Sequence, residues 1–209
     1  WVGLDGSSAC IDEAKLRHVN SVSRGRGTMQ TELHALDLCD PRQNYPVASD
    51  SVDIVRSLFF LQFAAESQAA LTHVIDEISR IVKPGGVLLV LVPDGDRVWP
   101  MLQSSSTARH GHFSLARCAQ EWTESSSIFG LEYRFSLANS SCSEHLLVPS
   151  YLEMQLSDRG FEAFIERGDE KIMSMPAQDF FLQCSDHMTL MHSILKRQSC
   201  SYYDWYFAT

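Results

Sequence analysis

Two hydrophobic periods alternate along the first half of the chain. Short apolar runs typical of β-strands lie at residues 1–5, 32–40, 52–63 and 86–93, and the third of these runs into a loop. A helix that Ser7 and Ser8 can cap is predicted between the first two runs, to about His18. Pro84-Gly85-Gly86 ends a second predicted helix. Its apolar residues, at helical spacing, are Ala70, Leu71, Val74, Ile75, Ile78 and Ile81.

This alternation of strands and helices predicts an α/β fold with a doubly wound, Rossmann-like sheet. The run at 86–93 is apolar throughout, as in a strand that is buried on both faces of a parallel sheet. In such sheets, ligands bind outside the carboxyl ends of the strands. The rim expected there comprises Asp5, Asp37 and the loops after Ser57 and Pro93.

The second half of the chain is less regular. Residues 96–114 begin like a helix and continue as a Ser- and His-rich loop, and residues 129–148 alternate like an antiparallel ribbon. The remaining predicted elements are a helix with Tyr151, Leu152, Met154 and Leu156, a strand at 161–166, a helical stretch with Phe180, Phe181, Met188, Leu190 and Met191, and an aromatic strand at 201–209. Since no internal repeat or second boundary interrupts the pattern, we expect residues 1–209 to form one domain.

Composition narrows the classes of function. The chain has 209 residues and a net charge of −9, which argues against a broad nucleic-acid groove, because such a groove needs a basic face. The six cysteines show no CxxC spacing and the eight histidines form no HxxxH or HExxH pair. We therefore expect free thiols in a reducing, intracellular compartment and no metal site. No apolar run approaches the roughly 20 residues of a membrane-spanning helix, so we expect no membrane partner.

Asp5 and Asp37 each end a predicted strand. Asp5 stands directly before a helix, where its two oxygens can accept the hydroxyls of a ribose, or where it can act as an ordinary capping acid. Asp37 can accept a hydrogen bond from an adenine amino group, or form a turn before Cys39-Asp40-Pro41. Together the two acids indicate an adenosyl ligand that lies across adjacent strand ends.

The stretch EISRIVKPGGVLLVLVPD, residues 77–94, resembles class I S-adenosylmethionine-dependent methyltransferases, in which Lys-Pro-Gly-Gly joins a helix to a buried strand. Other stretches resemble one branch of that family, the messenger RNA cap guanine-N7 methyltransferases. They are VDIVRSLFFLQFAAES (52–67), IFGLEYRFSL (128–137), SEHLLVPSYLEMQLSDRGF (143–161) and SYYDWYFAT (201–209). The resemblance covers nearly the whole chain and is most specific in the ribbon.

The resemblance implies a methyltransferase sheet with an antiparallel ribbon insertion and an aromatic C-terminal strand. It implies S-adenosylmethionine as methyl donor, S-adenosylhomocysteine as its product, and the 5′ end of capped RNA as partner. Fusion to or association with other capping-enzyme activities is a further expectation from the resemblance. On the cofactor side, Asp5 matches the acid that binds the ribose and Asp37 the acid beside the adenine. Phe63 stands at a family Tyr beside the methyl donor, and Leu58 replaces a family Gln near the cofactor, which removes a polar contact.

On the substrate side, the resemblance implies a cap site. Arg17 falls at a basic residue that contacts the cap, although a solvated helix arginine is the alternative, and Gln62 replaces a cap-contacting His. Glu144 matches the acid that recognises the guanine edge, and Tyr203, with Tyr202 as the alternative, matches an aromatic of the guanine pocket. No catalytic base is expected, because guanine N7 carries its own lone pair.

Two alternatives stay open: a small-molecule methyltransferase of the same fold, and a non-catalytic methyltransferase-like subunit. The family's first strand and Gly-rich loop should precede Trp1. We expect the chain to be part of a longer polypeptide, to lack that segment through disorder or cleavage, or to be a degenerate domain that binds no cofactor.

Overall fold

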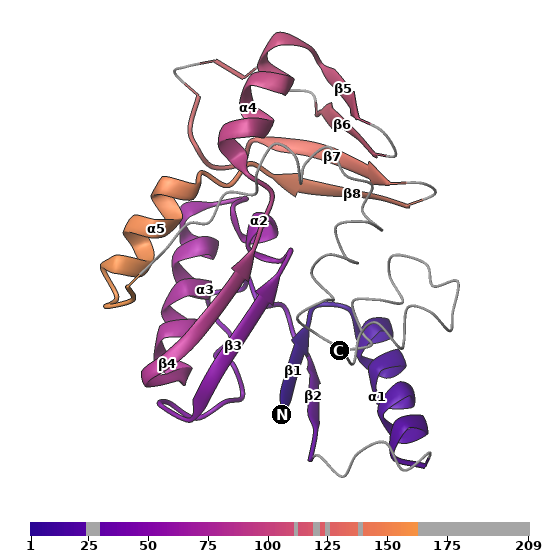
Figure 1. Cartoon of the computed structure of the whole chain (residues 1–209), viewed down its shortest axis with the longest axis vertical. Helices are drawn as coiled ribbons and strands as arrows, with labels where there is room; N and C mark the ends of the chain where they lie inside the picture. The colour runs from indigo at the N-terminus through magenta and orange to yellow at the C-terminus, as the bar shows by residue number, and fades with distance from the viewer. Residues whose placement is uncertain (24–29, 111–112, 119–121, 124–125, 138–139, 163–209) are drawn as a thin grey trace, which may run out of the picture. The chain divides into compact units, whose positions relative to one another are not determined.

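The computed structural model describes residues 1–23, 30–110, 113–118, 122–123, 126–137 and 140–162 (Figure 1). These lie in one compact unit, Trp1–Ile165, and a second unit, Glu166–Thr209, lies outside the described residues. The predicted strand at 161–166, the helical stretch around Phe180 and the aromatic strand at 201–209 therefore fall wholly or mostly outside them. No helix of the described part is long and apolar enough to cross a membrane.

The first strand pair is parallel. β1 (Val2–Asp5) pairs with β2 (Glu32–Ala35), Asp5 opposite Ala35, and α1 (Ser8–Ser23) lies against both strands (Figure 1). The Oγ of Ser7 accepts a hydrogen bond from the Cys10 N–H at 3.3 Å, as the capping prediction requires. The helix continues five residues beyond its predicted end at His18.

The second strand pair is also parallel. β3 (Val52–Leu58) pairs with β4 (Val82–Leu91), and α3 (Gln68–Ile81) connects them, which confirms this helix. A short helix, α2 (Leu61–Ala64), replaces the predicted loop after β3. β4 begins four residues earlier than predicted, because Lys83–Gly86 form an irregularity inside the strand rather than a turn before it. Gly85 adopts a φ of 78°, which a glycine accepts without strain.

The α/β character is confirmed, but a single doubly wound sheet is not seen in the described residues. β1 and β2 form one two-stranded sheet, β3 and β4 another, and no ladder joins them. The prediction that 86–93 is buried on both faces is also wrong for the described structure. Leu88 and Val90 pack into the core, whereas Val87, Leu89 and Leu91 are 40–50% exposed, because successive side chains point to opposite faces and only one is covered.

The predicted ribbon is part of a larger antiparallel sheet (Figure 1). β7 (Glu132–Leu137) and β8 (Ser140–His145) form the ribbon, and the sheet order is β5-β6-β7-β8. β5 (Thr107–His110) and β6 (Phe113–Arg117) occupy the stretch predicted as a Ser- and His-rich loop, so that prediction is wrong. The pairing of β6 with β7, and of β5 with β6, decides the conformation there, since a polar strand with a few inward apolar residues gives only a weak signal. α4 (Gly95–Ser104), the predicted helix start, lies beside β5 and β6.

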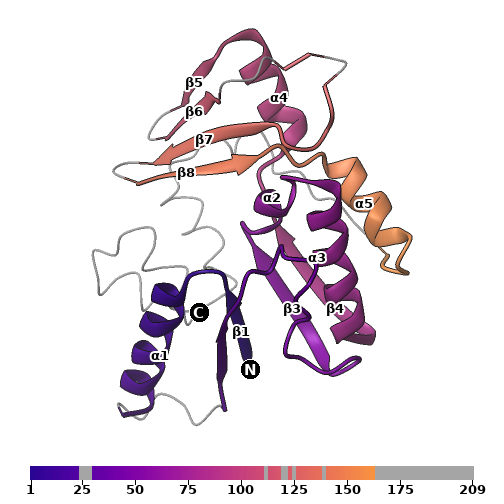
Figure 2. The same cartoon turned by 180° about the vertical axis from the view of Figure 1, so that it is seen from behind.

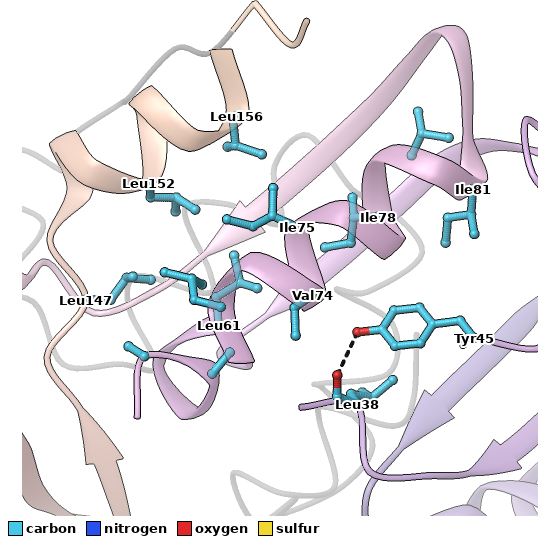
Figure 3. Packing of buried hydrophobic residues seen from close by; sticks show 14 residues of the cluster. Leu38, Tyr45, Leu61, Val74, Ile75, Ile78, Ile81, Leu147, Leu152 and Leu156 are labelled. Atoms are coloured by element: carbon cyan, nitrogen blue, oxygen red, sulfur yellow. Dashed lines mark hydrogen bonds between the residues drawn. The ribbon is translucent and has the colours of Figure 1, made fainter. Parts of the chain in front are cut away.

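The main core lies between α3, β3–β4 and α5 (Pro149–Ser157), whose predicted helix is confirmed (Figure 2). Leu61, Val74 and Ile75 are fully buried there, and Figure 3 shows Leu147, Leu152 and Leu156 facing them. The hydroxyl of Tyr45 donates to the carbonyl oxygen of Leu38 at 3.1 Å at the edge of this cluster (Figure 3). A second cluster, which includes Leu102, Leu115, Trp122, Leu131 and Tyr133, packs α4 against the antiparallel sheet.

Gly95 brings α4 into close contact with the chain leading to α5. A Cβ added at this buried position would overlap the carbonyl group of Leu147. We expect Gly95→Ala to lower the free energy of unfolding by about 1–3 kcal/mol, because backbone must move to admit the methyl group. Urea unfolding checks this. Gly6→Ala is the matched control, since the nearest atom to its added Cβ is 3.9 Å away. Equal unfolding midpoints for the two variants would contradict the claim that the close contact at Gly95 admits no side chain.

Candidate functional site

The carboxyl ends of β1 and β2 bring the two predicted cofactor acids to one edge. Asp5 is the last residue of β1, and Asp37 follows the neighbouring strand by two residues. The Oδ1 of Asp5 accepts the N–H of Ser7 at 2.7 Å, and the Oδ1 of Asp37 accepts the N–H of Cys39 at 3.0 Å. Both acids therefore order the turns that follow their strands, and among the described residues the second oxygen of each has no hydrogen-bond donor.

The end of β3 contains a strained residue. Phe59 follows the strand directly with a φ of 52°, which is uncommon for a residue with a side chain. Its N–H donates to the carbonyl oxygen of Leu91, and its own carbonyl accepts the side-chain N–H of Gln62 at 2.8 Å. This turn ends β3 beside Leu58, which is 40% exposed, and starts α2, which carries Gln62 and the half-buried Phe63.

Glu144 is the buried acid of the antiparallel sheet. It lies near the end of β8 with 6% of its surface exposed. The phenol O–H of Tyr133, directly opposite on β7, donates to its Oε2 at 2.8 Å, and the thiol of Cys142 donates to its Oε1 at 3.4 Å. None of the ion pairs among the described residues includes Glu144. It is thus a buried carboxylate held by neutral donors alone.

Gln62 and Glu144 belong to elements in contact. α2 lies against β8 (Figure 1), so the two elements that carry these predicted cap contacts are neighbours in the structure. Gln62 is 1% exposed, and its Oε1 has no hydrogen-bond partner in the described structure. A buried acceptor without a partner is costly, and here it is carried by an element that packs against the strand of a buried carboxylate, as expected where a ligand brings several hydrogen-bond donors.

Burial sets the protonation of the groups around Glu144. Desolvation, and after it the charge of Glu144, raises the pKa of the Cys142 thiol to about 12. The same two causes raise the pKa of the Tyr133 phenol far above its ordinary value. Both groups therefore stay protonated near neutral pH and remain hydrogen-bond donors to the carboxylate.

Two predicted site residues are not joined to this group. Arg17 lies on α1, where its Nε donates to Glu13 at 2.7 Å, and the strands that α1 packs against are β1 and β2. Tyr203, with its alternative Tyr202, lies outside the described residues. Among those residues the four cysteines Cys10, Cys39, Cys118 and Cys142 are free, and no cluster of potential metal ligands occurs.

Tyr133 and Cys142 are members of the site that the sequence did not single out. Side chains two residues apart in a strand point to the same face of the sheet. The sequence therefore predicts that Tyr133 shares a face with Phe135 on β7, and that Cys142 shares a face with Glu144 on β8. The register that sets Tyr133 opposite Glu144 depends on the pairing of β7 with β8, which the single strands do not specify.

The family model of the mRNA (guanine-N(7))-methyltransferase domain matches residues 1–191. The mRNA cap guanine-N(7) methyltransferase 2 of Oryza sativa subsp. japonica is 27% identical over 173 residues, which cover 74% of the chain and 49% of that protein. The tRNA N(3)-cytidine methyltransferase METTL2 of Mus musculus is 41% identical over 54 residues, 26% of the chain and 13% of that protein. An S-adenosylmethionine-dependent methyltransferase from Clostridium acetobutylicum superposes with a TM-score of 0.48 at 12% identity, over 76% of the chain and 62% of its own. The chain thus spans half or less of the two curated relatives.

Proposed function

Because the chain belongs to the mRNA (guanine-N(7))-methyltransferase family, we propose that the protein methylates N7 of the guanine at the 5′ end of capped RNA. S-adenosylmethionine is the proposed methyl donor. The observation that carries the substrate assignment is Glu144: a carboxylate with 6% exposure that is held by neutral donors, on a strand that packs against the helix carrying the unpartnered acceptor of Gln62.

Guanine has the complementary chemistry. Its N1–H and N2–H lie side by side and can both donate to the two oxygens of one carboxylate, whereas adenine offers no such pair. Hydrogen bonds to a charged acceptor are stronger than those between neutral groups. We infer that Glu144 binds this edge and Gln62 contacts the cap next to it. Arg17 and Tyr203 are proposed as further cap contacts, the first through its positive charge and the second by stacking on the base.

We propose that the cofactor binds at the carboxyl ends of β1, β2 and β3. We propose that the free oxygen of Asp5 accepts from the ribose hydroxyls, that Asp37 binds the adenine amino group, and that Leu58 and Phe63 line the pocket. The bound donor supplies a methyl group on a sulfonium centre, already activated for transfer. The exposed side chain of Leu58 and the free carboxylate oxygens of Asp5 and Asp37 are compatible with this placement.

The residues of the site suit a reaction that needs no general base. Guanine N7 has a free lone pair, so the protein's contribution is to hold N7 in line with the methyl group, which is worth up to about 7–11 kcal/mol in favourable cases. The carboxylate of Glu144 also faces the positive charge that develops on the guanine ring. Association with or fusion to other capping activities is a further proposal that the family suggests.

A binding comparison tests the substrate assignment. We expect the dinucleotide cap GpppA to bind at least about ten-fold more tightly than ApppA, because ApppA presents no paired N–H donors to Glu144. Isothermal titration calorimetry with both ligands measures the ratio. Equal dissociation constants for GpppA and ApppA, or no binding of either, would remove the proposed function. Binding of GpppA without any methyl transfer would instead favour the non-catalytic alternative.

A further inference from the structure

The carboxylate of Glu144 is held on both oxygens by its own sheet. Tyr133 reaches Oε2 across the strand pair, and Cys142 reaches Oε1 along β8. Because side chains alternate along a strand and Tyr133 is directly opposite Glu144, all three groups share one face of the ribbon. Each oxygen of a carboxylate has about two acceptor sites, so this arrangement leaves one on each oxygen for a ligand.

We propose that Tyr133 and Cys142 are positioning residues that fix the plane of the Glu144 carboxylate and thereby determine its selectivity for a base with two adjacent N–H groups. This inference rests on the proposed function and extends it to residues that do not touch the base. A carboxylate free to rotate could bind a single N–H donor nearly as well as a pair. A carboxylate held at both oxygens keeps the plane of its remaining acceptor sites in one orientation, so that both can face the paired donors of guanine at once.

Tyr133 is itself held rigidly. Its side chain is 1% exposed and contacts the indole of Trp122 edge-to-face, with ring centroids 6.4 Å apart. Trp122 in turn stacks on Trp99 of α4 at 5.6 Å. The phenol that donates to Glu144 is therefore held by the packed aromatic side chains of the second hydrophobic cluster. Through this hydrogen bond, the cluster orients the carboxylate.

Phenol and thiol have the right protonation for this role. Both remain protonated near neutral pH because burial and the charge of Glu144 raise the pKa of each. Neither brings a positive charge that would neutralise the carboxylate, so the charge of Glu144 remains available to the ligand. A lysine or arginine in place of either would compete with guanine for the same oxygens.

The test compares guanine with hypoxanthine, which keeps N1–H and lacks the N2 amino group. We expect Tyr133→Phe to weaken GpppA binding about ten-fold and IpppA binding less, so that the ratio of the two dissociation constants moves toward one. Cys142→Ala is expected to act in the same direction and more weakly, because a thiol is a poor donor. Titration calorimetry on both ligands gives the ratio directly.

Tyr45→Phe is the matched control, because it also removes a buried tyrosine hydroxyl, here one that donates to Leu38 in the other cluster. It should lower thermal stability similarly and leave the GpppA to IpppA ratio unchanged. If wild-type protein binds GpppA and the Tyr133→Phe ratio equals the wild-type ratio, the positioning role is wrong while the proposed function stands. If Tyr133→Phe does not fold, the ratio of the GpppA and IpppA dissociation constants in Cys142→Ala tests the positioning role: a ratio equal to that of the wild type would show it to be wrong. If wild-type protein does not bind GpppA, the proposed function fails first.

Discussion

Replacing Glu144 with glutamine is expected to lower kcat/KM for methyl transfer to guanine-capped RNA by about 10²–10³-fold. The amide keeps the size of the side chain but replaces one acceptor oxygen with an NH₂ group, which opposes an N–H of guanine. It also removes the charge that faces the ring as positive charge develops there. Steady-state kinetics with GpppA-capped RNA at several cofactor concentrations measures the change, and the affinity for S-adenosylmethionine should stay within about two-fold, because Glu144 is assigned to the cap and not to the cofactor.

Glu132→Gln provides the matched control on the same ribbon. Glu132 immediately precedes Tyr133 on β7, and its side chain therefore lies on the opposite face of the sheet. Its activity is expected to remain within about two-fold of wild type. Equal losses in Glu132→Gln and Glu144→Gln would attribute the effect to damage to the ribbon rather than to the loss of a guanine contact.

Glu77→Ala is expected to destabilise the fold by about 2–4 kcal/mol. Glu77 is 6% exposed on α3; its Oε2 accepts the N–H of Tyr45 at 2.6 Å, and it also accepts two hydrogen bonds from Arg80. Arg80 also donates to the carbonyl oxygens of Tyr45 and Val47. Alanine would leave the Tyr45 N–H without its acceptor and the guanidinium of Arg80 without its charged partner, although the two carbonyl oxygens would still accept from it. Chemical denaturation at neutral pH measures the change, and a loss below about 0.5 kcal/mol would contradict this role.

The same group predicts a pH dependence. Hydrogen bonds from Arg80, and after them the backbone N–H of Tyr45, hold the pKa of Glu77 below its ordinary value of 4.5. A carboxyl whose pKa is lower in the folded state contributes stability above its unfolded pKa and loses it as the pH falls through the folded pKa. The difference in melting temperature between wild type and Glu77→Gln should therefore be largest at neutral pH and shrink below pH 4.5. A constant difference down to the acid limit would contradict this assignment.

The elements that could be predicted are those in which apolar residues recur at a regular helical or strand spacing. The apolar residues of α3 follow one face for its whole length, and all six of its predicted core positions are buried. The alternation in β7 similarly identifies the ribbon, because its inward residues, Tyr133 and Phe135, are large. In both cases local pattern and tertiary packing favour the same structure.

The elements that could not be predicted depend on partners distant in sequence. β5 and β6 carry serine, histidine and arginine, and they are strands because β6 pairs with β7 on one side and with β5 on the other. α2 has only four residues, too few to show a helical period. The apolar run in β4 predicts burial on both faces, yet a run of this kind cannot reveal which of its faces the described chain covers.

The candidate site shows the same division. The strand-end acids Asp5 and Asp37 could be placed from the pattern, since parallel strands align their carboxyl ends. The surroundings of Glu144 could not, because they depend on the β7–β8 register and on the packing of α2 against β8. The family resemblance singled out Glu144 and Gln62, whereas the burial of both residues and the contact between their elements are information that only the folded chain contains.

The central claim is methyl transfer to guanine N7, and one measurement tests it most directly. GpppA-capped RNA is incubated with the protein and S-adenosylmethionine labelled in its methyl group, and the digested RNA is separated against standards. We predict that the label appears in m7GpppA and that Glu144→Gln reduces it by at least about 10²-fold. Label at a ribose hydroxyl or an internal base, or no label from protein that binds both the cap and the methyl donor, would contradict the account.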